Sequence, residues 1–395
     1  MVLKLKHKKS KTMLFSEVIG QESSKKLLKQ MASGGRMPHA LLFLGPQGSG
    51  KLALAIALAQ YLLCENPDAE DACGQCSQCK KAAKLIHPDL HFSYPTIGPR
   101  AISDNFLANW RQAVIENPYL DVNQWLQGIG AENKQGNITK EECVNIIKKL
   151  SLKTFESYRK VLIIWLPEFL GKEGNRLLKI IEEPPENTVF ILVAEEQELI
   201  LNTILSRCQI VSIKALSDEE TTEGLIRRKG LSREAALSVA YLASGNFNEA
   251  LQMAGQQSNN NTALFLEWMR NCYRGNPIDM VNWVESFAKL GRENQKHFLR
   301  YALHFLREYN LLKASQGQAR VRLQEQELQS AQKMTNILET GQVEQLAKLF
   351  SDCSYAVERN ANPKVLFLDA SIQMHKIMKG KLREAYTGLR AANVL

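Results

Sequence analysis

The stretch Gly45-Pro-Gln-Gly-Ser-Gly50-Lys51 decides the fold of this chain. It follows the apolar run Ala40–Leu44 and precedes the helix-forming run Leu52–Cys64. Glycines let a backbone turn tightly enough for its N–H groups to point at phosphate oxygens, and the lysine ammonium then reaches the β- and γ-phosphates. We therefore predict a phosphate loop, whose candidate nucleotide-binding residues are Gly45, Gly48, Gly50 and Lys51.

Short β-rich runs alternate with helical runs on both sides of this loop. Nearly continuous apolar strands separated by helices are typical of a parallel sheet that is buried on both faces. We predict an α/β core over residues 15–215. The predicted strands are Ala40–Leu44, Val161–Trp165, Val189–Val193 and Gln209–Ile213, and the predicted helices are Gln21–Ala32, Leu52–Cys64, Lys140–Leu150 and Lys172–Glu182.

A helical pattern takes over after the core. Two short helices, Asp218–Lys229 and Ser232–Ser244, end at Gly230 and Gly245 and predict a small helical lid over residues 216–258. The polar run Gln256–Asn261 predicts a linker, and residues 262–395 predict an all-helical C-terminal domain. The basic N-terminal residues 1–14 are expected to be a disordered extension.

Composition limits the function classes. The 395 residues suggest two or three domains, and the net charge of +9 is compatible with nucleic-acid contact, although many proteins that never touch DNA are as basic. There is no run of 18 or more apolar residues and no signal-peptide core, so we expect a cytoplasmic protein with no membrane partner.

The magnesium side of the predicted nucleotide site departs from an active one. Leu52 stands after the lysine, where a Ser or Thr hydroxyl would bind Mg²⁺. At the end of the strand Val161–Trp165, Trp165 and Leu166 replace the acidic pair that hydrolysis requires, and Glu168 follows too late, beyond a proline. We expect no ATP hydrolysis. Two interpretations of the loop stay open: a purely structural turn, or a site that binds ATP weakly without hydrolysing it.

Four of the eight cysteines lie close together in the sequence. The spacing C-x8-C-x2-C-x2-C suits tetrahedral Zn²⁺, because each CxxC turn can place two sulfurs on one ion. Four sulfur ligands leave no open position, so the zinc would be structural. An iron–sulfur cluster and a set of free thiols are the alternatives. The candidate metal ligands are Cys64, Cys73, Cys76 and Cys79.

Several motifs together resemble one known family. Phe15 with Val18–Gln21, the phosphate loop, the cysteine module, the run Leu177–Pro185 (LLKIIEEPP) and Ser206-Arg207-Cys208 occur in this order in bacterial clamp-loader subunits of the AAA+ superfamily. The resemblance is strong over residues 15–215 and weak beyond about residue 260. It points to the gamma/tau and delta-prime branch, and the degraded magnesium side favours delta-prime.

The resemblance also implies roles and partners. Arg207 would act as an arginine finger on a nucleotide bound by a neighbouring subunit, while Asn248 stands where a motor subunit has its sensor-two arginine. The helical C-terminal domain would join a collar of related domains. The implied partners are gamma/tau-type and delta-type subunits, with the sliding clamp and primer-template DNA reached through the complex at the nucleoid. An active gamma/tau-type ATPase is the alternative.

One segment departs from the common family pattern. Residues from about 87 to 136 form a long insertion that contains Trp110 and Trp125. We expect these tryptophans to pack against the core rather than to stack on bases, because few basic residues lie between them.

Overall fold

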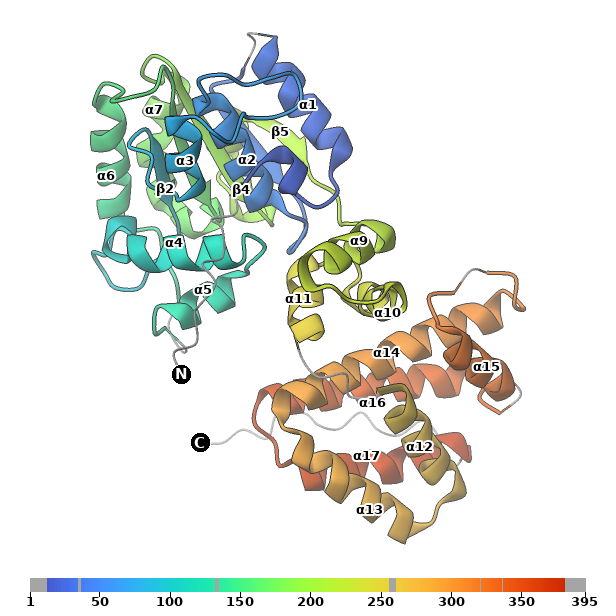
Figure 1. Cartoon of the computed structure of the whole chain (residues 1–395). Coiled ribbons are helices and arrows are strands. Elements are labelled where there is room, and N and C mark those ends of the chain that lie inside the picture. The colour runs from blue at the N-terminus through green and yellow to red at the C-terminus, as the bar shows by residue number, and fades with distance from the viewer. Residues whose placement is uncertain are drawn as a thin grey trace, which may run out of the picture. The chain divides into compact units, whose positions relative to one another are not determined.

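The computed structural model describes residues 13–34, 37–131, 135–255, 261–319, 321–335 and 337–380. The chain divides into two compact units, Met1–Gln252 and Met253–Leu395 (Figure 1). Most of the expected N-terminal extension and residues 256–260 of the predicted linker lie outside the described residues.

The first unit is built on a five-stranded parallel sheet with the order β2-β3-β4-β1-β5. Every residue of β3 and β4 is buried, as expected for inner strands covered on both faces. The four predicted strands are confirmed to within one residue at each end. The strands are β1 (Ala40–Leu44), β2 (Leu90–Ser93), β3 (Lys160–Trp165), β4 (Thr188–Ala194) and β5 (Gln209–Ser212).

Strand β2 was not predicted from the sequence and falls inside the segment expected to be an insertion. Leu90 pairs with Val161 and Ser93 with Ile164, so β2 is an edge strand of the central sheet. Its four residues include a histidine and a serine, and so short a run carries little periodicity. The part of the chain added to the core therefore begins after Ser93.

Helices cover both faces of the sheet (Figure 1). The helix predicted over Lys172–Glu182 is α-helical only in its second half, because a run of 3-10 turns with non-helical angles at Gly171 occupies the first. The helices of the core are η1 (Phe15–Glu17), α1 (Glu22–Ser33), α2 (Lys51–Leu63), α3 (Ser77–Ala83), η2 (Ser103–Phe106), α4 (Leu107–Glu116), α5 (Val122–Gly128), α6 (Lys140–Ser151), η3 (Pro167–Leu177), α7 (Leu178–Glu182), η4 (Gln197–Leu199) and α8 (Asn202–Leu205).

The tryptophans of the added segment are packed inside the protein, as expected. Trp110 and Trp125 are both almost fully buried. Trp110 stacks on Tyr94 with ring centroids 4.1 Å apart, and lies 5.2 Å from Trp125 and 5.2 Å from Trp165 at the end of β3. This aromatic cluster leaves neither tryptophan free to stack on a base.

Three helices follow the sheet: α9 (Asp218–Lys229), α10 (Arg233–Ala243) and α11 (Phe247–Gly255). A capping box of Ser217 and Glu220 begins α9, and Gly230 ends it in the left-handed conformation. The two predicted lid helices are confirmed to within one residue.

The second unit is entirely helical over its described residues. Trp268 lies at its centre, stacked on Trp283 at 4.8 Å and on Phe350 at 5.2 Å. No helix in the described ranges has both the length and the apolar composition needed to cross a membrane. The helices are α12 (Asn261–Arg274), α13 (Pro277–Phe287), η5 (Ala288–Leu290), α14 (Arg292–Ala314), α15 (Glu325–Met334), α16 (Thr340–Glu358) and α17 (Pro363–Met378).

Candidate functional site

The phosphate loop links β1 to α2 and is in close contact with two other segments. A β-carbon at Gly48 would lie 1.8 Å from Oδ1 of Asn246, and one at Gly50 would lie 2.9 Å from the ring of Tyr119. The backbone N–H of Phe247 also donates to the carbonyl of Gly48 at 3.1 Å. The start of α11 and the turn before α5 therefore cover the loop.

Lys51 is engaged within the protein. Its ammonium donates to the carbonyl of Pro46 at 2.6 Å and lies 3.7 Å from a carboxylate oxygen of Glu195. Burial lowers the pKa of Lys51 to about 8, although the charges of Glu195 and Glu168 partly oppose the shift. Lys51, which was predicted to contact the phosphates of a nucleotide, thus contacts Pro46 and Glu195 of the protein itself.

The positions where an active site would bind magnesium hold buried apolar side chains in the structure. Leu52, Trp165 and Leu166 are each at most 4% exposed. Leu166 also takes a left-handed conformation, with φ of 57°, where the chain turns from β3 into η3. None of these three side chains has an atom that can bind a hard cation.

Glu168 and Glu195 come close to Lys51, which sequence analysis did not foresee. One carboxylate oxygen of Glu168 accepts the backbone N–H groups of Glu195 and Glu196. Burial raises the pKa of Glu168 and of Glu195, which the positive charge of Lys51 partly offsets. Glu195 lies in the turn after β4, which is adjacent to β1 in the sheet, whereas Glu168 follows β3 and reaches this turn through its hydrogen bonds. No local sequence signal could reveal contacts between residues so far apart in the chain.

Asn248 is uncharged, and it links α11 to the residues before α5 through hydrogen bonds. Its amide donates to Asp121 at 3.0 Å and its carbonyl oxygen accepts from Asn117 at 2.7 Å, and the residue is fully buried. Arg228 lies over the ring of Tyr119, 5.0 Å from its centroid. These contacts attach α11 and α9 to the turn that precedes α5.

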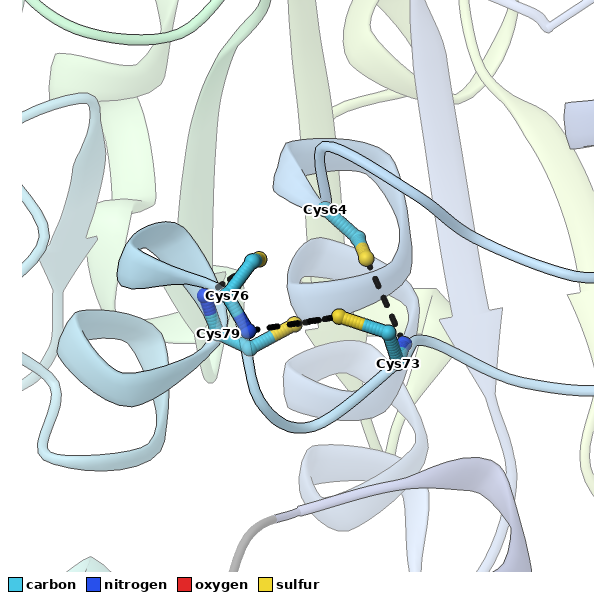
Figure 2. Close-up of side chains that lie close together, drawn as sticks. All are labelled: Cys64, Cys73, Cys76 and Cys79. Atoms are coloured by element: carbon cyan, nitrogen blue, oxygen red, sulfur yellow. Dashed lines mark hydrogen bonds between the residues drawn. The ribbon is translucent and has the colours of Figure 1, made fainter.

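The four cysteines converge on one point, as the spacing predicts (Figure 2). Their sulfur atoms all lie within 4.8 Å of one another, and those of Cys73 and Cys79 are 3.9 Å apart. Sulfurs that bind one tetrahedral zinc ion at about 2.3 Å are separated by roughly 3.8 Å. The cluster thus has the dimensions of a single-ion site.

Backbone N–H groups donate hydrogen bonds to sulfur atoms of this cluster, which stabilises the deprotonated thiolate form of these cysteines. The N–H groups of Cys73, Cys76 and Cys79 point at the sulfurs of Cys64, Cys73 and Cys76, at 3.3 to 3.4 Å. Donors from Gln75 and Cys76 lower the pKa of Cys73 to about 7, whereas burial raises the pKa of Cys64 and Cys79. Four sulfurs at this separation, three of them facing N–H donors, suit Zn²⁺.

Arg207 lies at the end of α8, outside the phosphate loop and the cysteine cluster. Its Nη1 group donates to the carbonyl of Thr203 at 2.8 Å, and the remaining donors face Glu182 of α7, with Nη2 at 3.0 Å from the carboxylate. The side chain is 29% exposed. The contact between Glu182 and Arg207 was not predicted from the sequence, in which the two residues are 25 positions apart.

Three comparisons with known proteins bear on this arrangement. Residues 20–217, about half of the chain, match the family described as DNA polymerase III, delta subunit. The DNA polymerase III subunit delta' of Bacillus subtilis is 28% identical over 230 residues, which are 58% of this chain and 57% of that protein. The DNA polymerase III subunit gamma of Buchnera aphidicola is 29% identical over 245 residues, 60% of this chain and 57% of that protein.

A solved structure is similar at a lower level. The DNA polymerase III gamma subunit-related protein of Thermotoga maritima is 14% identical, with a TM-score of 0.39 over 90% of this chain and 99% of that one. The match to the two curated relatives spans somewhat more than half of their length.

Proposed function

Because the chain belongs to the DNA polymerase III delta subunit family, we propose that it is a delta-prime-type clamp-loader subunit that does not hydrolyse ATP. In this role it assembles with gamma/tau-type and delta-type subunits in the cytoplasm. The assembled complex then acts on the sliding clamp and primer-template DNA. The helical second unit contributes to a collar made of the corresponding domains of these subunits.

The apolar magnesium side of the phosphate loop is the observation that carries the proposal. Leu52, Trp165 and Leu166 are buried side chains without a ligand atom. Phosphoryl transfer depends on a metal ion that bridges the β- and γ-phosphates, and on a residue that orients the attacking water. The contacts of Lys51 with Pro46 and Glu195 further support a loop with a structural role.

Arg207 is the residue with which the chain contributes to catalysis. A guanidinium near the surface, already oriented by a carboxylate, can approach a phosphate bound by an adjacent subunit. There it stabilises the negative charge that develops on the transferred phosphoryl group. The chain thus supplies an arginine finger and leaves metal binding and water activation to its neighbour.

The cysteine cluster holds a structural zinc ion in this proposal. Cys64 follows α2 directly, and Cys76 and Cys79 belong to the start of α3. A zinc ion there fixes the loop between the two helices, because four sulfur ligands close its coordination sphere. It takes no part in nucleotide chemistry.

Hydrolysis of ATP by the purified full-length chain tests the proposal. We expect no release of phosphate above that of a Lys51→Ala variant. The second candidate is an active gamma/tau-type ATPase, which the retained Lys51 and the gamma-type relative favour. Hydrolysis that is lost in the Lys51→Ala variant would establish this second function instead.

A further inference from the structure

The second unit contains an open cavity of about 370 Å³ between α12 and α15. Leu266, Met269 and Tyr273 line it from α12, where their spacing of three and four residues puts them on one face of the helix. Met334 of α15 and Met378 of α17 add to the apolar lining. We call this space the α12–α15 cavity. Its volume and apolar lining are typical of ligand sites, which range from roughly 300 to 1,000 Å³.

Hydrogen bonds from other helices hold the walls of the cavity in place. The hydroxyl of Tyr309, a fully buried residue, lies 2.8 Å from the carbonyl of Met334 and 3.0 Å from that of Leu338. The side-chain amide of Gln342 donates to the carbonyl of Met378 at 3.3 Å. Leu338 and Met378 both line the cavity. The walls are thus fixed before any ligand binds, so that little free energy is lost in ordering them.

The charge at the rim of the cavity is positive. Arg270 and Arg274 line it from α12 and Lys333 lines it from α15, and all three residues are exposed. The lining contains no acidic residue within the described ranges. In the part of the chain that the structure describes, none of the three cations forms an ion pair. A ligand that carries negative charge beside apolar groups therefore complements the cavity.

We propose that the α12–α15 cavity binds an acidic peptide segment of a partner protein. One or two large apolar side chains of this segment enter the cavity, and acidic residues on either side of them pair with Arg270 and Lys333. The lining methionines Met269, Met334 and Met378 suit such a ligand, because their flexible side chains adjust to apolar groups of different shape. This site does not depend on the clamp-loader function proposed above, since it lies within the second unit alone.

Other occupants complement the cavity less well. Residues 381–395, which follow α17, carry three basic residues and one acid, so that like charges would meet at the rim. A second copy of the chain would bring the same cations to the rim. Bases of a nucleic acid stack on flat rings, but Tyr273 is the one aromatic residue of the described lining, and the ammonium of Lys379 already lies 3.8 Å from its ring centroid.

Fluorescence anisotropy with a labelled peptide, Glu-Asp-Glu-Phe-Leu-Glu-Asp-Glu, tests the proposal on the full-length chain at low salt. The wild type should bind the peptide, and Arg270→Glu/Lys333→Glu should bind it at least about 10-fold more weakly, because two rim charges are reversed. The matched control is Lys289→Glu/Lys348→Glu. It changes the net charge equally at two exposed lysines outside the cavity, so it should bind as the wild type does.

Ser330→Trp tests the cavity itself without a change of charge. Ser330 lines the cavity on α15, and a tryptophan there would fill the space that the apolar side chains of the peptide need. We expect at least about 10-fold weaker binding. A peptide with serine in place of Phe and Leu should also bind the wild type at least about 10-fold more weakly, because only its charge remains. Thermal unfolding of each variant verifies that it is folded.

Several results would overturn the proposal. The first is no binding of the peptide by the wild type, and the second is equal binding of the serine peptide or by the rim variant. An oligothymidylate that displaces the peptide and binds more tightly would reassign the cavity to nucleic acid. Peptide binding that strengthens when residues 381–395 are removed would assign the cavity to that segment. Self-association that is lost in Ser330→Trp would assign it to a second copy of the chain.

Discussion

The guanidinium of Arg207 donates two hydrogen bonds to the same carboxylate oxygen of Glu182, from Nε at 3.2 Å and from Nη2 at 3.0 Å. Glu182 ends α7, within the run Leu177–Pro185 that resembles the clamp-loader family. The two side chains are 29% and 57% exposed, so water competes for both. A contact of this kind orients an arginine, yet it can be exchanged for a phosphate at little cost.

Replacing Glu182 should therefore leave the isolated chain stable. We expect Glu182→Gln to change the free energy of unfolding by less than about 1 kcal/mol, as is usual for exposed ion pairs. Urea unfolding followed by circular dichroism measures it. A loss of several kcal/mol would mean that Arg207 braces the fold, which would argue against a finger free to leave Glu182.

Metal content tests the cysteine cluster. The purified chain should contain about one zinc ion per molecule, and Cys76→Ser should lower this amount and the melting temperature together. Cys208→Ser is the matched control, because Cys208 lies outside the cluster and should leave the zinc content unchanged. Iron with visible absorbance would replace the zinc assignment by an iron–sulfur cluster.

Tyr119 covers the phosphate loop at Gly50, so a larger residue at this position should destabilise the chain. Gly50→Ala should destabilise the chain by about 2 to 3 kcal/mol, because φ is +90° and the new methyl group would meet the Tyr119 ring. Gly230→Ala is the control: its φ is +68° but nothing lies within 4 Å, so only the backbone strain of about 1 kcal/mol remains. Equal losses would indicate that Tyr119 does not cover the loop.

The pKa of Lys51 predicts how stability depends on pH. The unfolded chain keeps this proton up to about pH 10.5, but the folded chain only up to about pH 8. Between these values the unfolded state binds more protons, so stability should rise with pH. The wild type should gain about 2 to 3 kcal/mol over this range relative to Lys51→Met. Parallel profiles for the two proteins would show that Lys51 is not buried as described.

Much of the fold could be predicted because its signals are local. The phosphate loop is contiguous with its strand and helix, and the four cysteines fall within sixteen residues, so their spacing alone indicates one metal site. Inner strands such as β3 and β4 are apolar throughout. Strand β2 lacks this signal, since it is short and lies at the sheet edge.

The environment of Lys51 and of Arg207 could not be predicted, because it is made by tertiary contacts. Glu195 reaches Lys51 only because β4 lies beside β1. Tyr119 and Asn246 are about 70 and 195 residues from the loop that they cover. Glu182 and Arg207 are likewise 25 residues apart and meet through the packing of α7 and α8. No periodicity or spacing rule encodes such pairs.

ATP hydrolysis by the assembled complex tests the central claim most directly. The assembly that we propose would be reconstituted from this chain with gamma/tau-type and delta-type subunits, and its Arg207→Ala and Lys51→Ala variants would be compared in the presence of primer-template DNA. The account predicts that Arg207→Ala lowers the DNA-stimulated rate of ATP hydrolysis at least about 2-fold without loss of assembly. An arginine finger raises the rate of hydrolysis about 10³-fold or more, but only at the one nucleotide site that it serves. Lys51→Ala should leave the rate unchanged. A rate that falls with Lys51→Ala and is untouched by Arg207→Ala would contradict the account.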